Sequence, residues 1–223
     1  MDRREFVGRM AVVGAATAGA TWGPAAVAQA GYVEGQHYQH FSPPLPVSAP
    51  AGKVEVIEFF SYACPHCHAF EPALDAWVKK LPADVVFRRI PVPFLFNAEN
   101  FQRLYFSLEA LGQVDGVHAK VFTAVHRDKK LLNRPEEIAD FVAQAGVDRA
   151  KFLGAFNGFG MGAKLAQAKT QMERYKLDGV PMLGIHGRFA TSPSMVGGAM
   201  PEGESQTRAL ALTEQLINRV RKG

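Results

Sequence analysis

The clearest hydrophobic pattern in the chain is a strand, a helix and a second strand between residues 53 and 92. Residues 53–62 alternate with a period of two, with Val54, Glu58 and Phe60 on one face. Because both faces are mostly apolar, this strand is predicted to be covered on both sides. Residues 65–80 repeat apolar positions at steps of three and four, which is typical of a helix. Residues 85–92 again favour a strand, so the segment predicts a βαβ unit with a parallel strand pair.

The rest of the chain predicts a helical block followed by two strands and a last helix. Pro135, glycines and other breakers separate five helices, expected at 99–111, 117–127, 136–145, 149–156 and 163–175. Residues 180–189 predict a strand that turns at His186-Gly187 into a second strand ending near Val196. Residues 204–221 predict an amphipathic helix, and a short strand is expected near 38–41. The order βαβ, helical block, ββα predicts an α/β fold with a helical insertion at about 97–177.

The first thirty residues follow a different pattern. Arg3, Arg4 and Arg9 give a positive start, and an Ala- and Gly-rich stretch then ends in Ala26-Val27-Ala28-Gln29-Ala30. A signal peptidase accepts small residues at A-x-A spacing, so residues 1–30 are predicted to be a cleaved signal peptide that exports residues 31–223. The run 3–7 also resembles a twin-arginine signal. The alternative is an uncleaved membrane anchor, which the many glycines and alanines disfavour.

Composition and charge exclude little except nucleic acid binding. The chain is 48% hydrophobic and 21% charged, which is ordinary for a soluble globular protein. Its formal charge of +4 becomes +3 without residues 1–30, which hold three arginines, one aspartate and one glutamate. Lysines and arginines are dispersed rather than gathered in a basic stripe, so a nucleic acid partner is not expected.

The two cysteines change the picture more than the composition does. Exported proteins often carry several structural disulfides, yet this chain has only Cys64 and Cys67, three positions apart. A disulfide that closes so small a loop removes little entropy from the unfolded chain, so it stabilises the fold weakly. At positions i and i+3 of a helix the two sulfurs share a face and can bond. The pair is therefore predicted to serve redox chemistry.

The start of the predicted helix favours an anionic sulfur at Cys64. Unpaired backbone N–H groups and the positive end of the helix dipole converge there. Pro65 suits the first turn because it has no N–H, and His66 can add a donor or a positive charge beside the sulfur. Stabilising the thiolate stabilises the reduced form. The disulfide is therefore predicted to be easily reduced and the protein to be a good oxidant.

These residues carry a resemblance to a known family. The run from Val56 to Cys67, VIEFFSYACPHC, resembles the active-site strand and helix of the DsbA family of periplasmic disulfide oxidases. Gly179-Val180-Pro181 resembles that family's second motif, a Val followed by a cis-proline that faces the cysteines. The resemblance covers residues 31 to 221 and implies a thioredoxin fold with a helical insertion, located in the periplasm. The family is itself the standard example of an acidic, oxidising cysteine.

The resemblance also implies a role for each matched residue. Cys64 would be the exposed nucleophile that forms a mixed disulfide with the substrate, and Cys67 its buried partner. Val180 and Pro181 would present backbone to an extended substrate peptide.

Glu58 would be the family's buried acidic residue, which accepts protons beneath the active site. Arg88 or Arg89 would be its basic neighbour. Strand alternation independently favours burial of Glu58 over a solvent-facing position. Residue type alone would leave Pro181 an ordinary trans proline.

Zinc binding and haem attachment are the alternatives to redox catalysis for the two cysteines. Structural zinc needs four ligands, and there is no second cysteine pair. The run from Cys64 to His68 also satisfies the C-x-x-C-H pattern of haem attachment, with Met161, Met172 or Met195 as conceivable axial ligands. The strand-to-helix context favours redox catalysis over haem. The remaining histidines (His37, His40, His118, His126, His186) show no ligand spacing, and Phe94, Phe96, Phe101 and Met182 are expected in the core.

The favoured function is a protein thiol oxidase. It would donate the Cys64–Cys67 disulfide to reduced, newly exported proteins, without a metal or any other cofactor. A membrane quinone-linked oxidase of the DsbB type would then restore the disulfide. A reductase or an isomerase on the same fold is the nearest alternative, although little chain precedes the first core strand to form an isomerase's dimerisation domain. A peptide-binding chaperone, for which the cysteines would be dispensable, is a further alternative.

Overall fold

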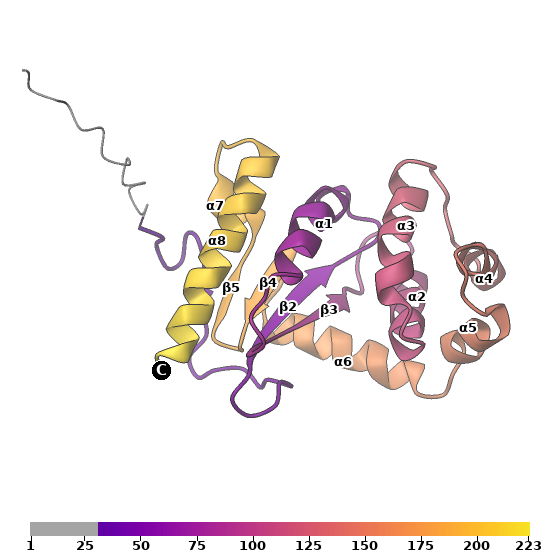
Figure 1. Cartoon of the computed structure of the whole chain (residues 1–223), viewed down its shortest axis with the longest axis horizontal. Helices are drawn as coiled ribbons and strands as arrows, with labels where there is room; N and C mark the ends of the chain where they lie inside the picture. The colour runs from indigo at the N-terminus through magenta and orange to yellow at the C-terminus, as the bar shows by residue number, and fades with distance from the viewer. Residues whose placement is uncertain (1–30) are drawn as a thin grey trace, which may run out of the picture. The chain divides into compact units, whose positions relative to one another are not determined.

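A computed structural model describes residues 31–223, and the predicted signal peptide lies outside the described residues. Its centre is a five-stranded sheet with strand order β1-β5-β4-β2-β3 (Figure 1). The strands are β1 (Gln39–His40), β2 (Val54–Phe60), β3 (Val85–Pro91), β4 (Met182–Ile185) and β5 (Phe189–Thr191). β2 and β3 run parallel, and the pairs β2–β4, β4–β5 and β1–β5 are antiparallel.

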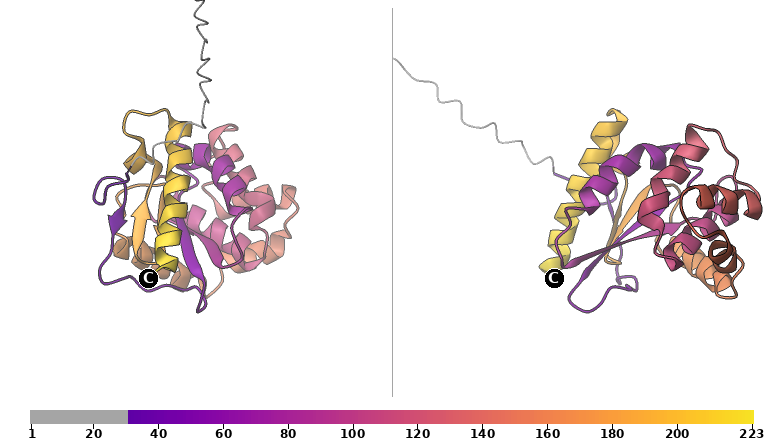
Figure 2. Two further views of the ribbon diagram at one scale, coloured as in Figure 1. Left: turned by 60° about the vertical axis from the view of Figure 1, so that its left-hand side comes forward. Right: turned by 45° about the vertical axis from the view of Figure 1, so that its right-hand side comes forward.

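The helices divide into two groups. α1 (Pro65–Val78) and α8 (Glu202–Arg221) lie over one face of the sheet (Figures 1 and 2). Five helices follow between β3 and β4: the first four form a block beyond the β3 edge, and the last runs from that block back beneath the sheet (Figure 1). The five are α2 (Ala98–Ala110), α3 (Val114–His126), α4 (Pro135–Gln144), α5 (Arg149–Phe156) and α6 (Met161–Arg174). A short helix, α7 (Pro193–Gly197), precedes α8. This thioredoxin-like arrangement confirms the predicted fold class.

β2 positions the predicted site because it is the buried centre of the sheet. All seven of its residues are buried, as its two apolar faces predict. α1 and α8 cover one face with Phe70, Leu74 and Leu216, while Ile57 and Phe59 lie on the other, where Phe59 contacts Tyr175. Phe59 of β2 pairs with Met182 of β4, so the end of one strand lies beside the start of the other. The loops that carry the cysteines and the predicted cis-proline therefore meet at this edge of the sheet.

One prediction about the last third of the chain was wrong. The second strand does not reach Val196: β5 ends at Thr191, and α7 begins two residues later. Ser192 is the N-cap of α7, where its Oγ accepts a hydrogen bond from the Met195 N–H at 3.1 Å, and Pro193 occupies the first turn. A serine followed by a proline is itself a helix-start signal, and it outweighed the β-like composition.

Smaller differences concern the helical block. Phe96 is not in the core but 57% exposed, in a loop where Leu95 and Asn97 both have positive φ. The helix expected at 117–127 begins earlier, at Val114, so Gly116 lies inside α3. Within residues 31–223, no helix is both long enough and apolar enough to cross a membrane.

Candidate active site

Cys64 is the N-cap of α1, so its sulfur faces the unpaired N–H groups of the first turn. Its Sγ accepts a hydrogen bond from the backbone N–H of Cys67 at 3.3 Å, and Pro65 begins the helix. In the thiol form Sγ also donates to the backbone oxygen of Val180 at 3.4 Å. Cys64 was predicted to be exposed, but it is only 4% exposed, because the loop that carries Val180 covers it.

The pKa values of the two thiols are shifted in opposite directions. The hydrogen bond from the Cys67 thiol is the largest of the effects that lower the pKa of Cys64 to about 6. The N–H groups of Cys67 and His66 and the charge of His66 add to it, and burial opposes it. Cys67 is fully buried, and burial raises its pKa well above the usual value. In the reduced protein, the environment therefore favours the thiolate at Cys64 and the thiol at Cys67.

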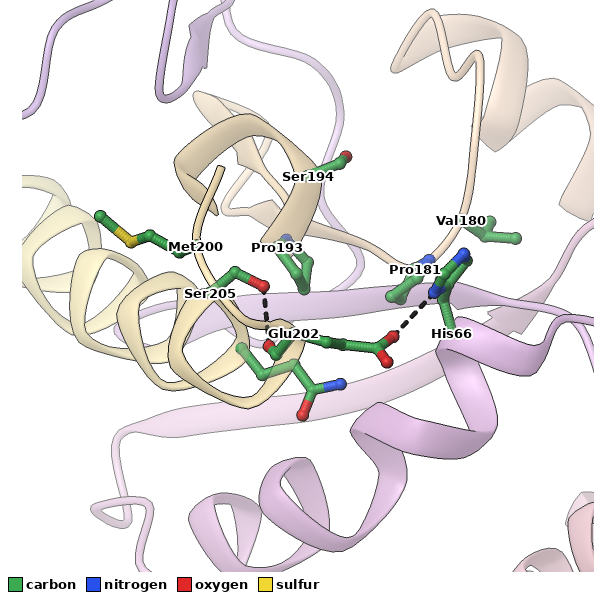
Figure 3. Close-up of a pocket in the computed structure, with 9 residues that line it drawn as sticks. His66, Val180, Pro181, Pro193, Ser194, Met200, Glu202 and Ser205 are labelled. Atoms are coloured by element: carbon green, nitrogen blue, oxygen red, sulfur yellow. Dashed lines mark hydrogen bonds and ion pairs between the residues drawn. The ribbon is translucent and has the colours of Figure 1, made fainter. Parts of the chain in front are cut away.

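His66 meets a partner that the sequence did not indicate. Its Nδ1 lies 2.7 Å from Oε1 of Glu202, the first residue of α8 (Figure 3). Both side chains are largely exposed, at 71% and 50%. The hydrogen bond to Glu202 raises the pKa of His66, which favours the imidazolium. The contact joins residues 136 positions apart, so no local pattern could have revealed it.

Val180 and Pro181 lie beside the cysteines, and the peptide bond between them is cis. They line a groove of about 280 Å³ together with His66, Pro193, Ser194, Met200, Glu202, Ser205 and Gln206 (Figure 3). Elements from three parts of the chain form this groove: the start of α1, the loop before β4, and the α7–α8 segment.

Beneath the cysteines, Glu58 forms part of a buried charged cluster. It is fully buried on β2, as strand alternation favours, and its Oε2 accepts a hydrogen bond from Arg89 Nε at 2.8 Å. Arg89 also donates to Glu71 of α1 at 2.9 Å, so one cation serves two carboxyl groups. Burial raises the pKa of Glu58 and of Glu71 to about 7 despite Arg89. Near neutral pH the cluster can therefore hold or release a proton. Arg88 instead pairs with Glu55.

A histidine and a tyrosine extend this cluster. His118 of α3 is 3% exposed; its Nδ1 lies 2.7 Å from the Tyr62 hydroxyl, and its Nε2 lies 3.3 Å from Glu71 Oε2. Burial lowers the pKa of His118 to about 3, so the ring is neutral. The Nδ1–Tyr62 contact is a hydrogen bond, whereas His118 Nε2 and Glu71 Oε2 are close together but have no hydrogen-bond partner among the described residues.

Sequence reasoning missed Glu71 and His118, although signals for both were present. Glu71 follows Cys67 by four residues on the buried side of α1, and His118 adjoins Val117 and precedes Val121 and Phe122, all of which are buried on α3. A polar residue within an apolar helical stripe indicates a buried polar group.

The haem alternative conflicts with the geometry of the motif. Attachment would require both sulfurs to reach the porphyrin, and Cys67 has no exposed surface. The His68 ring is stacked on His126, with 4.9 Å between ring centroids. Among the described residues, no group of three or more His, Cys, Asp or Glu side chains is arranged to hold a metal ion.

A thioredoxin-like sheet with a dithiol at the start of α1 and a cis-proline beside it defines a thiol:disulfide oxidoreductase. The family described as a DSBA-like thioredoxin domain matches residues 55–202. The chain belongs to this family.

Similar proteins agree with this assignment. The thiol:disulfide interchange protein DsbA of Bordetella pertussis is 38% identical over 213 residues, which cover 95% of this chain and 96% of that protein. The DsbA of Pseudomonas aeruginosa is 41% identical over 192 residues, 85% of this chain and 86% of that protein. A crystal structure of Pseudomonas aeruginosa DsbA superposes with a TM-score of 0.78 at 40% identity and covers 86% of this chain and 95% of that one.

Proposed function

We propose that the protein oxidises cysteine pairs in newly exported proteins in the periplasm, and that its own Cys64–Cys67 disulfide is the oxidant. The asymmetry of the two thiols carries this proposal. Cys64 has a pKa of about 6, and Cys67 has a pKa raised by burial. A protein whose reduced form is stabilised by one thiolate gives up its disulfide easily, so it accepts electrons from substrates.

The reaction proceeds in two exchange steps. A substrate thiolate attacks Sγ of Cys64; the Cys64–Cys67 bond breaks, and its electron pair leaves on Cys67, which takes up a proton. The substrate's second thiolate then attacks its own sulfur in the mixed disulfide, and Cys64 leaves as a thiolate. The substrate loses two electrons and two protons and gains a disulfide. The low pKa of Cys64 makes it a good leaving group in this second step.

Substrate binding is assigned to the groove beside Val180 and Pro181. An extended peptide would pair with backbone groups of this loop as an added strand does, and it would align its cysteine with Cys64. The support for this is the contact of Cys64 Sγ with the Val180 oxygen and the continuity of the loop with the groove. Because backbone groups carry the recognition, substrates of many sequences would fit.

Glu58 is assigned to proton transfer with Cys67. The buried Cys67 leaves as an anion in the first step, and a nearby group must then supply a proton. The charge of Glu58 acts on Cys67, and the Glu58 pKa of about 7 allows either protonation state. Arg89 holds the carboxyl in place through a hydrogen bond of 2.8 Å.

The catalytic cycle requires a partner that reoxidises Cys64 and Cys67. A membrane quinone-linked oxidase of the DsbB type fits this requirement, since a quinone accepts the two electrons and two protons that the dithiol releases. The signal-like residues 1–30 and the family of the chain support export to the periplasm, where both partners meet.

The direction of electron flow is tested by a redox titration of the residue 31–223 protein against glutathione. The expected result is that the dithiol form predominates even when oxidised glutathione is abundant. A disulfide that persists in a large excess of reduced glutathione would instead indicate a reductase.

Two variants test the roles of the sulfurs. Cys64→Ser should abolish disulfide transfer, and Cys67→Ser should accumulate a mixed disulfide with substrate; a fully active Cys64→Ser protein would overturn the assignment.

A further inference from the structure

Two charged side chains meet across the edge of the groove, one from each side. His66 comes from the first turn of α1 and Glu202 from the first turn of α8, and their Nδ1 and Oε1 atoms are 2.7 Å apart (Figure 3). His66 lies between the two cysteines in sequence, and its backbone N–H and its charge both act on the Cys64 sulfur. The positive charge near the Cys64 sulfur therefore depends on the protonation state of His66, whose side chain Glu202 contacts.

The position of Glu202 is fixed by the segment behind it. The Ser205 hydroxyl donates to the Glu202 backbone oxygen at 2.7 Å, which closes the first turn of α8 (Figure 3). Ser205 is only 7% exposed and packs tightly on Gly197 of α7, where an added Cβ would lie 2.6 Å from the Ser205 Cβ. Glu202 thus extends from a packed helix start, although its carboxylate is half exposed.

We propose that Glu202 is a positioning residue for disulfide exchange, which acts through His66 by holding the imidazole, in its positively charged form, beside the Cys64 sulfur. The effect on turnover rests on the proposed function, whereas the effect on Cys64 does not. His66 and Glu202 are the groups in the groove lining that can carry a charge; the other lining residues are neutral. Cys64 and Glu202 are accordingly the two groups whose charges act on His66.

This arrangement predicts that removal of the Glu202 charge affects the Cys64 thiolate in opposite directions with and without His66. With His66 present, loss of Glu202 removes the partner that favours the imidazolium, so the thiolate loses a neighbouring positive charge. Without His66, the carboxylate of Glu202 would act on the thiolate only as a like charge, and its removal could only favour the thiolate. A general structural effect of a Glu202 variant would not change sign with residue 66.

The experiment compares Glu202→Gln, His66→Gln and the double variant in the residue 31–223 protein. Glu204→Gln is the control, because it removes the same charge from the same helical turn and the Glu204 side chain has no hydrogen-bond or ion-pair partner among residues 31–223, while its backbone N–H donates to the Pro201 oxygen. The measurements are the ultraviolet absorbance of the Cys64 thiolate against pH, the equilibrium constant with glutathione, and the titration of His66 by NMR.

The expected result is that Glu202→Gln lowers the His66 pKa, raises the Cys64 pKa and makes the disulfide about two- to fivefold harder to reduce by glutathione, the range that an exposed ion pair allows. Glu204→Gln should match the unmodified protein, and Glu202→Gln should cause no further loss in the His66→Gln background. The proposal is overturned if Glu202→Gln behaves as Glu204→Gln does, or if its effect persists without His66. If the unmodified protein proves to be a reductant, the proposed function fails, yet the difference between the two glutamate variants still decides the role of Glu202.

Discussion

Cys64 and Cys67 are three residues apart on one helix, yet their environments shift their acidities in opposite directions. Cys64 caps the helix and accepts an N–H bond, whereas Cys67 faces the core below it. The Cys67 thiol, the unpaired N–H groups of the first helical turn and the charge of His66 all favour the Cys64 thiolate, whereas burial disfavours an anion at Cys67. At this scale, a redox property follows from where a helix begins.

The low pKa of Cys64 predicts how stability depends on pH. Its folded-state pKa of about 6 lies below its unfolded value, so the unfolded chain binds more protons in between and the free energy of unfolding rises with pH. We expect the reduced protein to gain about 1–2 kcal/mol relative to the oxidised protein between about pH 6 and pH 8.5, after allowance for solvent screening. Guanidinium unfolding of both forms at a series of pH values measures this.

The oxidised protein is the control for the other titrating groups. Glu58 and Glu71 have raised pKa values in the fold, so each favours the folded state below about pH 4.5 and loses that contribution as the pH rises through about 7. These carboxyl groups are present in both redox forms, and only the dithiol form has the Cys64 thiolate. Parallel pH profiles for the two forms would contradict the assignment of a thiolate to Cys64.

Replacement of Arg89 alone is expected to lower the free energy of unfolding strongly. Arg89→Met would leave Glu58 and Glu71 buried without a cation, so we expect a loss of about 3–5 kcal/mol at neutral pH, shrinking in acid as the carboxyls are protonated. Urea unfolding measures the loss. Adding Glu58→Gln and Glu71→Gln should restore most of it, because no buried charge then remains.

The matched control for Arg89 is Arg149, which pairs with Asp140 at the surface with side chains 46% and 61% exposed. Arg149→Met should cost less than about 1 kcal/mol, as exposed ion pairs do. A combined variant that is no more stable than Arg89→Met would show that packing, rather than charge, explains the loss.

Single residues of the site could be predicted from the sequence only where a pattern marked them. Strand alternation was enough to favour burial of Glu58, since Val56 and Phe60 flank it. The cover over Cys64 and the partner of His66 depend on Val180 and Glu202, which approach from more than a hundred positions away. Spacing along the chain carries no information about such contacts.

At the scale of elements, the turn between β4 and β5 depends on one glycine. Gly187 has φ +64, and an added Cβ would overlap the backbone oxygen of Leu45, whose N–H donates to the Gly187 oxygen at 2.8 Å. We expect Gly187→Ala to cost about 3–4 kcal/mol, because left-handed backbone strain and a backbone clash add up. Chemical denaturation measures the loss.

Gly146 supplies the comparison for Gly187. It also has positive φ, +99, but no atom lies within 4 Å of the added Cβ. Gly146→Ala should therefore cost only the backbone term of about 1–2 kcal/mol. Equal losses at the two glycines would mean that the docking of the segment around Leu45 adds nothing to the turn.

Most elements were predictable because their patterns agree with their surroundings. β2 is apolar on both faces and is buried on both. The apolar residues of α1 recur at the helical period along the side that is buried. The failures occurred where capping or backbone conformation overrode composition. Ser192 starts α7 inside an apparent strand, and positive φ at Leu95 and Asn97 places Phe96 outside the core. Caps and left-handed residues act locally, and hydrophobic period does not detect them.

At the scale of the whole molecule, the topology assembles the site from distant segments. β2 ends where β4 begins, so the cysteine turn and the loop of Pro181 lie side by side although 116 residues separate Cys64 from Val180. The intervening chain forms the helical block, and the segment from β5 through α7 brings Glu202, the first residue of α8, to the groove. The order βαβ, helices, ββα predicted this assembly in outline.

The outer strands of the sheet bear on the proposed function, in which the protein meets unfolded chains. One edge is β1, only two residues long, and the other is β3, which carries Arg88 and Arg89 and ends at Pro91. Short, charged or proline-ended edges are poor templates for a foreign strand. In the proposed function, an unfolded substrate would therefore pair poorly with either edge strand. Repeated contact with such substrates would then not start their aggregation on the sheet.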